Sequence, residues 1–332
     1  MNKKYNVAVV GATGLVGSTF LKVLDEYDFP ISRLTLFASE KSVGKTVEFK
    51  GKEYKLKKLE KGCFEGVEVA LFSAGGKVSE EWAPEAEKSG AVVIDNSSAF
   101  RMVKECALIV PEINISAFDG ARKIIANPNC STIQCVLPLK PLKDKFGLKR
   151  VIYSTYQAVS GSGQKGKNDL IRTLKGEKPE FYPYDISKTC IPHIDVFTDN
   201  GYTKEEIKMI NETRKILDLP NLPVSATCVR VPVLNAHAVS IAAELEKPFT
   251  LDEIKKAFAE QKGVVVADDP QNNVYPVSTM ANGNDSVYVG RIRRDLSCEN
   301  GILFYAVSDN IRKGAASNAV QIAEELIKED KI

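Results

Sequence analysis

The sequence predicts an α/β protein of two domains, in which a parallel sheet covered by helices is followed by an α+β domain built on a mixed sheet. Two patterns support this prediction. Up to about residue 130, short continuous apolar runs alternate with helical stretches, which is typical of a parallel sheet buried on both faces. Beyond that point the strand-like runs are longer and alternate apolar with polar residues, as in a sheet with one exposed or interface face.

The elements of the first domain follow one another as strand and helix. Helices are expected at 15–27 and 80–88, and the polar stretch 39–58 is interpreted as a hairpin that turns at Gly51-Lys52. Apolar runs of four to six residues between turn residues favour strands in the centre of a sheet. The predicted strands lie at 5–10, 34–37, 69–72, 91–94, 107–110 and 124–126.

The second domain is expected to carry helices on one mixed sheet. An amphipathic helix at 315–328 should pack back on the first domain, and the irregular segment 177–200 is either a surface excursion or a partner contact. The first domain is therefore placed at 1–129, joined by the C-terminal helix 313–330, and the second at 130–312. The predicted strands are 151–159, 224–233, 236–244, 264–267, 286–293 and 302–308, with helices near 166–174, 204–217 and 251–261.

Composition argues against several functional classes. The 332 residues include 45 basic and 43 acidic side chains, and this balance predicts neither a nucleic-acid nor an anionic-membrane partner. No apolar run approaches the ~20 residues that span a bilayer, and the N-terminus has no signal-peptide core, so a cytoplasmic location is expected. Seven cysteines without a Cys-x-x-Cys pair, beside only two histidines, predict neither a disulfide framework nor a metal site.

A glycine-rich turn, GATGLVG at 11–17, stands between the first strand and the first helix. Gly11 permits a tight turn, Gly14 lets the backbone approach a pyrophosphate, and Gly17 allows close packing of helix on strand. The helix N-terminus would then supply N–H groups to the phosphates. The pattern predicts a Rossmann-type dinucleotide site, with a purely structural glycine turn as the alternative. Further candidate contacts in the same turn are Thr13, Leu15 and Val16.

The end of the second strand indicates which nucleotide is bound. NAD sites commonly present an acidic residue there, whereas this chain has Ser39, Lys41 and Ser42 around a lone Glu40. Hydroxyl groups and an ammonium suit a 2′-phosphate, so the sequence favours NADP. A solvated polar loop is the alternative interpretation.

Small polar residues follow two later strands. One set includes Ser73 and Gly75, and the other is Asn96-Ser97-Ser98. The ends of parallel strands border the ligand crevice of such a sheet, so both sets are candidate cofactor contacts. They could equally be ordinary helix caps.

Cys130 lies where the last strand of the first domain turns into a helix, in the stretch NPNCST. The dipole and N–H groups of a helix N-terminus favour a thiolate and lower the pKa of a thiol. The same N–H groups, with the Asn129 amide, could form an oxyanion hole for a thiohemiacetal. We therefore expect Cys130 to be a nucleophile, although most cysteines are structural, as Cys135 in the same helix should be.

A nucleophilic thiol needs a base, and the chain has two histidines. His237 follows Arg230 by seven residues, and Pro232 and Asn235 between them indicate a break between two strands. His237 is therefore a candidate general base for the thiol and an acid or base in a hydride step, or else an ordinary structural histidine. His193 has no comparable surroundings and is interpreted as structural.

Several of these stretches together resemble the aspartate-β-semialdehyde dehydrogenase family. They are GATGLVG, NPNCST, TYQAVSGSG, EEIKMINETRKIL and CVRVPVLNAHAV, and the resemblance covers essentially the whole chain. It implies an NADP-dependent enzyme that reversibly converts L-4-aspartyl phosphate to L-aspartate 4-semialdehyde and phosphate, in lysine, threonine, methionine and diaminopimelate biosynthesis. The second domain would then be a catalytic and dimerisation domain, in a homodimer or homotetramer.

The resemblance also assigns roles to individual residues. Cys130 matches the nucleophile that forms the acyl-thioester, Gln157 the residue that orients the substrate, and His237 the acid/base group. Arg230 resembles the partner of the substrate α-carboxylate, a role that suits a planar guanidinium. Three residues that would otherwise be interpreted as solvated surface charges complete the substrate site: Glu205 for the ammonium, and Arg101 and Lys208 for the phosphate. Cofactor contacts are implied at Ser160, Gly161, Gly163, Asp309 and Asn310.

Three other interpretations stay open on the sequence alone. N-acetyl-γ-glutamyl-phosphate reductase has a similar architecture, but its substrate has no ammonium, so Glu205 discriminates against it. Glyceraldehyde-3-phosphate dehydrogenase is more distant, because its cysteine region differs and it favours NAD. A nucleotide-sensing module without turnover would leave Cys130, Arg230 and His237 without a role.

Overall fold

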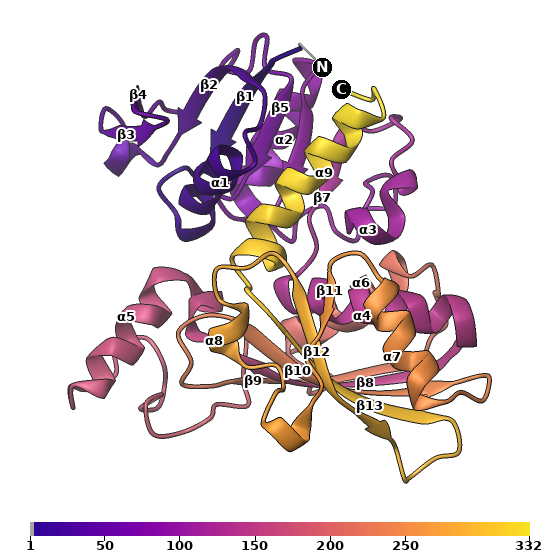
Figure 1. Ribbon diagram of the computed structural model, residues 1–332. Helices are drawn as coiled ribbons and strands as arrows, with labels where there is room; N and C mark the ends of the chain where they lie inside the picture. Colours follow the sequence, from indigo (N-terminus) through magenta and orange to yellow (C-terminus); the bar gives the residue numbers. More distant parts are fainter. Residues whose placement is uncertain (1–2) are drawn as a thin grey trace. The chain divides into compact units, whose positions relative to one another are not determined.

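The computed structural model describes residues 3–332, and the chain divides into two compact units (Figure 1). The N-terminal unit comprises Met1–Pro128 together with Ala315–Ile332, and the C-terminal unit comprises Asn129–Gly314. The first contains a five-stranded parallel sheet and the second a six-stranded mixed sheet. The predicted α/β fold class, with a Rossmann-type parallel sheet followed by a mixed-sheet domain, is confirmed.

The sheet of the N-terminal unit has the strand order β2-β1-β5-β6-β7, and all neighbouring strands are parallel. Nearly all residues of β1, β5, β6 and β7 are buried, because both faces are covered. This is why the strands read as continuous apolar runs in the sequence. Their bounds are β1 Tyr5–Val10, β2 Ile31–Phe37, β5 Val69–Phe72, β6 Val92–Asp95 and β7 Ile124–Ala126.

Helices from both ends of the chain cover this sheet. α1 (Leu15–Glu26) and α9 (Ser317–Lys328) lie side by side and share one apolar core with alternate residues of β1 and β5 (Figure 1). α2 (Gly76–Lys88) packs on β5, β6 and β7. The last helix of the chain therefore belongs to the core of the N-terminal unit.

Two predicted elements of this unit differ from the structure. Residues 107–110 do not form a strand: only Leu108 bridges to Ala126, because β7 offers three residues and α3 (Pro111–Asn114) begins at once. The hairpin is present as β3 (Thr46–Phe49) and β4 (Lys52–Lys55), but its turn lies at Lys50-Gly51, where both residues have positive φ. Short helical turns also occur as η1 (Glu40–Ser42) and η2 (Ile115–Ala117).

The sheet of the C-terminal unit has the order β11-β12-β13-β10-β8-β9. The four central strands are antiparallel, whereas β11 and β9 join the two edges in parallel. β8 and β10 alternate buried with more exposed residues, as expected when helices cover one face. The bounds are β8 Leu148–Gln157, β9 Val224–Arg230, β10 His237–Leu245, β11 Val264–Val266, β12 Val287–Arg294 and β13 Gly301–Ser308.

A central helix, α4 (Cys130–Phe146), packs on this sheet and contacts β8, β10, β12 and β13. Residues 131–139 are all buried, so the helix is apolar around its whole circumference rather than along one stripe. Two further helices pack on it, α6 (Lys204–Ile216) and α7 (Leu251–Glu260). The smaller elements of the unit are α5 (Gly163–Leu174), α8 (Ser278–Ala281), η3 (Val159–Ser162), η4 (Pro270–Asn272) and η5 (Arg312–Ala316).

β8 and β9 end two and three residues before their predicted ends, and β10 begins one residue after its predicted start. β8 and β9 end at Gln157 and Arg230, and β10 begins at His237. β8 runs parallel to β9, so Gln157 lies opposite Arg230, and antiparallel β10 pairs Ala238 with Tyr156. The strand pairing thereby places Gln157, Arg230 and His237 at the same end of the three neighbouring strands β8, β9 and β10.

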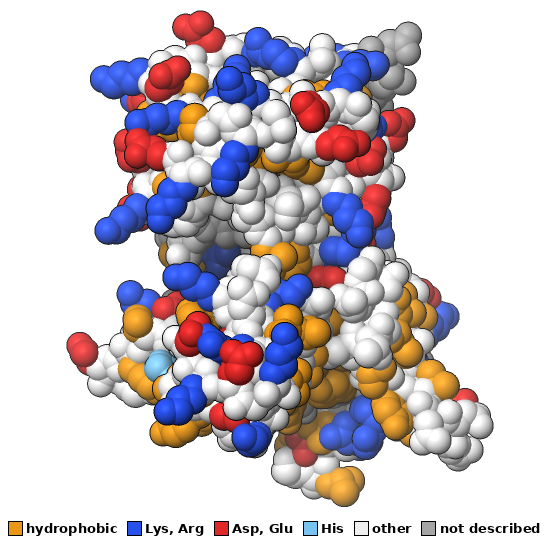
Figure 2. Space-filling model, turned by 90° about the vertical axis from the view of Figure 1, so that its left-hand side faces the viewer, with side chains coloured by type: hydrophobic (Ala, Val, Ile, Leu, Met, Phe, Trp, Pro, Cys, Tyr) orange, Lys and Arg blue, Asp and Glu red, His pale blue; other side chains and the backbone are white. Residues whose placement is uncertain are grey.

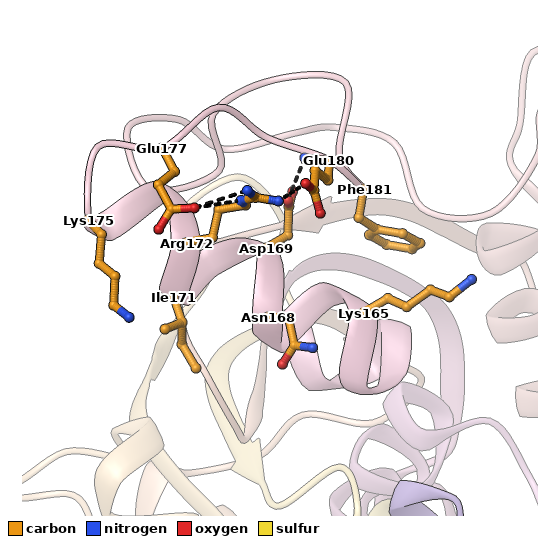
Figure 3. A pocket seen from close by; sticks show the side chains of 9 residues that line it. All are labelled: Lys165, Asn168, Asp169, Ile171, Arg172, Lys175, Glu177, Glu180 and Phe181. Atoms are coloured by element: carbon orange, nitrogen blue, oxygen red, sulfur yellow. Dashed lines mark hydrogen bonds and ion pairs between the residues drawn. The ribbon is translucent and has the colours of Figure 1, made fainter.

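The irregular segment 177–200 begins at the end of α5 and is anchored to it. Asp169 accepts hydrogen bonds from the backbone N–H groups of Glu180 (2.6 Å) and Tyr182 (3.0 Å). Arg172 forms ion pairs with Glu177 (3.0 Å) and Glu180 across a surface pocket of about 590 Å³ (Figure 3). The start of this segment is therefore tied to α5.

Farther along, the same segment returns to the sheet. Ile191 and Arg230 exchange two backbone hydrogen bonds (2.9 and 2.8 Å), and the carboxylate of Asp195 pairs with Lys208 on α6 at 2.8 Å. The backbone of this segment thus pairs with Arg230, the last residue of β9.

Charged side chains of both signs are interspersed on the face shown in Figure 2, without a concentrated basic area. Apolar side chains are more frequent on the C-terminal unit in this view. Among the described residues, all large exposed apolar side chains except Val43 and Met102 belong to that unit. Within residues 3–332, helices of the length and apolarity needed to cross a membrane are absent, as are clusters of three or more His, Cys, Asp or Glu side chains able to hold a metal ion.

Candidate active site

The N-terminus of α4 presents Cys130 as its first helical residue. Asn129 caps this helix, because its Oδ1 accepts hydrogen bonds from the N–H groups of Ser131 (2.9 Å) and Thr132 (3.2 Å). Cys130 is half-buried, whereas Cys135 is fully buried and burial raises its pKa well above the ordinary value. The helix start therefore provides the setting in which a thiolate is stabilised, and Cys135 lies in the core.

Asn129 is also bound to two buried carboxylates. Its backbone N–H donates to Glu212 Oε2 (2.6 Å), and its Nδ2 donates to Glu205 Oε1 (2.9 Å). The oxyanion role expected for the Asn129 amide stays a prediction. With Oδ1 capping the helix and one Nδ2 hydrogen donated to Glu205, a single N–H hydrogen of the carboxamide is left for a substrate oxygen.

Glu205, in the first turn of α6, is the centre of a buried polar network. The helix begins with a capping box, which fixes the position of this turn. Glu205 Oε1 accepts from Asn129 Nδ2 (2.9 Å) and Gln157 Nε2 (3.1 Å), while Oε2 pairs with Lys208 Nζ (2.8 Å). One carboxylate thus joins the start of α4 to the end of β8.

Lys208 lies between two carboxylates, Glu205 Oε2 and Asp195 Oδ2, each at 2.8 Å. Burial alone would raise the pKa of Glu205, but the Lys208 charge and the hydrogen bonds from Asn129 and Gln157 lower it to about 2. Burial alone would lower the pKa of Lys208, but Glu205 and Asp195 hold it above its ordinary value. Both groups stay charged at neutral pH, and Lys208, expected to contact phosphate, is bound here to protein carboxylates.

The backbone of Ala158 links Arg230 to His237. Its N–H donates to His237 Nδ1 (2.9 Å), and its carbonyl oxygen accepts from Arg230 Nη1 (2.6 Å). A Cβ on Gly161 would lie 2.7 Å from Arg230 Nη1 and 3.0 Å from His237 Nε2, so the glycine leaves room for both groups. Ala158 directly follows Gln157, so this pair adjoins the carboxylate network.

The hydrogen bond to His237 identifies the nitrogen that carries its proton. A backbone N–H can only donate, so Nδ1 is the acceptor and the neutral ring carries its hydrogen on Nε2. Burial and the charge of Arg230 lower the pKa of His237 to about 3, and the charge of Glu205 opposes this shift. Nε2 is buried and has no hydrogen-bond partner among the described residues. In this arrangement the ring presents the Nε2–H as a hydrogen-bond donor, and its role as the acid/base group stays a prediction.

In the N-terminal unit, close backbone packing requires the glycines of the turn at 11–17. Gly11 has φ +86°, and a Cβ there would lie 2.3 Å from the carbonyl oxygen of Ser73. A Cβ on Gly17 would lie 2.0 Å from the carbonyl oxygen of Gly11, which shows how closely α1 approaches the turn. α1 has no side-chain cap at Gly14, so its first N–H groups suit an anion. In the same turn Thr13 is exposed, and Leu15 and Val16 are half-buried.

The loop after β2 carries the residues expected at a 2′-phosphate. Ser39 and Lys41 are exposed, and Ser42 is half-buried. The neighbouring acidic residue, Glu40, pairs with Lys58 at 2.5 Å. The negative charge that would oppose a 2′-phosphate is therefore balanced by a second ammonium.

At two later strand ends the alternative of side-chain caps fares differently: α2 has no side-chain cap, whereas Ser97 Oγ accepts the backbone N–H of Ala99 at 3.1 Å. Gly75 precedes α2 with φ +88° and no side-chain cap. After β6, the hydroxyl of Ser97 donates to Asp95 at 2.6 Å. Both strand ends therefore remain candidate parts of a dinucleotide crevice.

Arg101 is buried, with 7% of its surface exposed, and so is not a solvated surface charge. Its Nε donates to the carbonyl oxygen of Asn127 (2.9 Å) and its Nη2 to that of Asn96 (3.0 Å). The two asparagine side chains are hydrogen-bonded to each other at 2.8 Å. The guanidinium is thus held at the ends of β6 and β7, and its contact with phosphate remains a prediction.

The remaining cofactor residues suggested by the sequence lie in the C-terminal unit. Ser160 Oγ lies 3.0 Å from Asn310 Nδ2 and 3.1 Å from its Oδ1, and both residues are buried. Asp309 accepts hydrogen bonds from the backbone N–H groups of Gly283 and Ile311, each at 2.8 Å, so its carboxylate organises the local chain. Gly161 is exposed and Gly163 half-buried.

Sequence patterns did not single out three residues that shape this site. Asp195 reaches Lys208 from an irregular loop, with φ +67°, and no periodicity predicts that contact. Ala158 acts through its backbone, which leaves no mark in the side-chain pattern. Glu212 follows Glu205 by seven residues and so lies on the same face of α6, which is a signal that could have been used.

The chain is similar to known proteins over nearly its whole length. The models of the semialdehyde dehydrogenase NAD binding domain and dimerisation domain match residues 6–121 and 139–313. Aspartate-semialdehyde dehydrogenases from Aquifex aeolicus and Bacillus subtilis are 54% and 48% identical, each over 99% of both chains. Aspartate semialdehyde dehydrogenase II from Vibrio cholerae, also solved complexed with ASA, has a TM-score of 0.94 at 45% identity, over 98% of this chain and 99% of that one.

Proposed function

The chain belongs to the aspartate-semialdehyde dehydrogenase family, and from this premise we propose how its own residues carry out the reaction. The enzyme converts L-4-aspartyl phosphate reversibly to L-aspartate 4-semialdehyde in amino-acid biosynthesis, with a nicotinamide dinucleotide as cofactor. One observation supports the assignment of roles. A continuous series of contacts runs from Asn129, beside Cys130, through Glu205 and Gln157 to the backbone of Ala158, which binds Arg230 and His237.

The substrate is held by charges of opposite sign. Arg230 offers the guanidinium N–H groups not donated to Ala158 to the α-carboxylate. Glu205 is ionised at neutral pH and accepts the α-ammonium, while Gln157, held by Glu205, orients the chain of the substrate. This pair of charges selects a free amino acid and disfavours an N-acylated one.

The thiolate of Cys130 attacks the acyl carbon of the substrate. A C–S bond forms, the bond from that carbon to the phosphate oxygen breaks, and the product is an acyl-thioester on Cys130. Lys208 and Arg101 are the cations assigned to the departing phosphate. Since Lys208 is shared between Glu205 and Asp195, phosphate competes with Asp195 for the ammonium.

When bound, a nicotinamide dinucleotide would supply a hydride to the thioester carbon. As that carbon becomes tetrahedral, negative charge develops on its oxygen, and the Nε2–H of neutral His237 donates a hydrogen bond to it. Collapse of this oxyanion re-forms the carbonyl and expels the Cys130 thiolate, so the aldehyde leaves without a proton transfer from the ring.

NADP is the proposed form of the cofactor. The support is the loop after β2, where Ser39 and Lys41 are exposed and Glu40 is paired with Lys58. Side-by-side kinetics with NADP and NAD test this proposal, and a lower KM for NAD would contradict it. Lys41→Ala should raise the KM for NADP more than that for NAD, because an ammonium interacts with a 2′-phosphate that NAD lacks.

Oligomerisation is expected from the dimerisation domain, and we propose a homodimer or homotetramer formed through the C-terminal unit. The concentration of exposed large apolar side chains on this unit supports that choice. Light scattering of the purified protein distinguishes the two states, and a monomer at micromolar concentration would contradict both. A cytoplasmic location remains a prediction from the sequence.

The assay that tests the function follows the near-ultraviolet absorbance of the reduced nicotinamide. L-aspartate 4-semialdehyde, inorganic phosphate and NADP together should produce it, and omission of phosphate should abolish turnover beyond one equivalent of enzyme. N-acetylglutamate 5-semialdehyde serves as the rival substrate. Preference for that aldehyde, or turnover that ignores phosphate, would overturn the proposal.

A further inference from the structure

Ala236, the residue before His237, has an unusual backbone conformation. Its φ of +69° lies in the left-handed region, which residues with a Cβ rarely adopt. The residue is fully buried, and β10 begins directly after it. A strained conformation of this kind persists only where the surroundings determine it, and such residues concentrate at functional sites.

The buried carboxamide of Asn310 holds this conformation. Its Oδ1 accepts the backbone N–H of Ala236 at 3.0 Å, and the carbonyl oxygen of Ala236 accepts from Ser278 Oγ at 3.2 Å. The other contacts of the carboxamide are with Ser160 Oγ, 3.0 Å from Nδ2 and 3.1 Å from Oδ1. Both polar groups of the Ala236 peptide backbone are thus bound by side chains.

Backbone hydrogen bonds join the two loops that surround the imidazole. The backbone N–H groups of Val159 and Ser160 donate to the carbonyl oxygens of Val233 (2.8 Å) and Leu234 (3.1 Å). The first loop carries Ala158, whose N–H selects the tautomer of the ring, and the second leads into His237 itself. Asn310 contacts both loops, through Ser160 in the first and Ala236 in the second. Loss of Asn310 should therefore shift the imidazole relative to the Ala158 N–H that donates to it.

We propose that Asn310 is a positioning residue for His237: by binding the N–H of Ala236 it stabilises the left-handed turn that aims the imidazole, with Nε2–H toward the substrate oxygen. This inference rests on the role proposed above for His237. It is compatible with a contact from the remaining Nδ2 hydrogen to the nicotinamide, because that hydrogen is not needed for Ala236.

A double-mutant cycle tests the coupling. Asn310→Ala should lower kcat about 10–100-fold, the effect of a misplacement of about 1 Å at a reacting group. Glycine adopts positive φ without strain. In the Ala236→Gly background, the fold loss of kcat caused by Asn310→Ala should therefore be smaller by a factor of at least about five. An equal loss in both backgrounds, accompanied by a raised KM for the dinucleotide, would mean that Asn310 acts on the cofactor alone and would overturn the proposal.

A second readout needs neither cofactor nor turnover. The chain has two histidines, so with ¹⁵N-labelled imidazole and His193→Asn as the starting protein a single ring remains. The parent should show one neutral tautomer protonated at Nε2. Asn310→Ala should give a mixture of tautomers, and adding Ala236→Gly should restore the single one; an unchanged tautomer in Asn310→Ala would refute the inference.

Asn310→Asp guards against a variant that does not fold. It keeps an oxygen that accepts the N–H of Ala236, so the Nε2–H tautomer should persist, and a mixed spectrum in a folded Asn310→Asp protein would also count against the proposal. Absence of turnover in the parent would instead contradict the proposed function, while the tautomer measurement would still stand.

Discussion

Two regions of the C-terminal unit hold a basic side chain between two carboxylates, and they differ in burial. Lys208 lies between Glu205 and Asp195, and the Lys208 and Glu205 side chains are 25% and 7% exposed. Arg172 lies between Glu177 and Glu180, whose side chains are 49% and 72% exposed (Figure 3). The composition of the two groups is nearly the same, so their different consequences come from the surroundings.

The group around Arg172 is surrounded by solvent, whereas the group around Lys208 is hydrogen-bonded to further residues of the candidate active site. Water screens the charges around Arg172, and such pairs contribute little to stability. Glu205 has exchanged water for hydrogen bonds from Asn129 and Gln157, so its charge helps to position the residue beside Cys130 and the end of β8. The same arrangement of charges therefore contributes to the site only where burial replaces water by specific hydrogen-bond partners.

The strongest test of the buried region removes the thiol that it surrounds. Cys130→Ser should lower turnover by at least about 10³-fold, because the hydroxyl is a far weaker nucleophile at neutral pH. The dinucleotide should still bind. Cys190→Ser, at an exposed thiol in the segment 177–200, is the matched control and should stay within about twofold of the parent. Retained activity in Cys130→Ser would remove this residue from the mechanism.

The direct comparison substitutes one carboxylate in each region. Glu205→Gln should lower kcat/KM about 10²-fold and reduce the free energy of unfolding by about 1.5–3 kcal/mol, because the buried negative charge and one of its two acceptor oxygens are lost. Glu177→Gln should change stability by about 0–1 kcal/mol and leave kinetics unaltered. Urea unfolding and steady-state kinetics measure both. Equal losses in the two variants would show that burial is not the deciding factor.

Acid should affect the buried region in two pH windows. The pKa of His237 is lowered from 6.5 to about 3 and that of Glu205 from 4.5 to about 2, so the unfolded chain binds each proton first. The histidine contribution to stability is full above pH 6.5 and is lost as the pH falls toward 3. The glutamate contribution is lost below pH 4.5. His237→Asn should therefore reduce the slope of unfolding free energy against pH between about 5 and 6.5. A slope identical to that of the parent would show that His237 is not buried as a neutral ring.

The smallest effect is expected in the surface region. Arg172→Ala should reduce the free energy of unfolding by about 0–1 kcal/mol, and 1 M salt should reduce the difference further, because exposed ion pairs are screened. Turnover should stay within about twofold of the parent. A loss of activity comparable to that of Glu205→Gln would place the segment 177–200 among the parts of the site, and the contrast between the two regions would fail.

Much of the fold could be predicted because burial on both faces leaves continuous apolar runs, as in β1 and β5. The errors lie where other forces decide. Residues 107–110 are apolar, yet a three-residue partner strand and the start of α3 leave room for a single bridge at Leu108. β8 ends before its apolar run does because η3 begins at Val159, and β9 does so because Pro232 has no N–H to donate to a neighbouring strand.

The candidate site was predictable in part. Cys130 is recognisable from its place between a strand and a helix, and the glycine turn from its spacing. Glu205 and Lys208 sit in a polar helix where the local pattern indicates solvated charges, so only the resemblance to a family singled them out. The contact of the Ala158 N–H with His237 joins segments 79 residues apart, and Asp195 reaches Lys208 from an irregular loop without periodicity.

By itself, the sequence determined the alternation of elements, the apolar faces that pack them and the two local signals at helix starts, since each depends on neighbours within a few residues. Only the tertiary structure decided which charges are buried, which ring nitrogen of His237 carries the hydrogen, and that Ala236 adopts a left-handed conformation. Those properties arise from the surroundings that distant segments supply, because desolvation and hydrogen-bond partners are set by folding and not by local order.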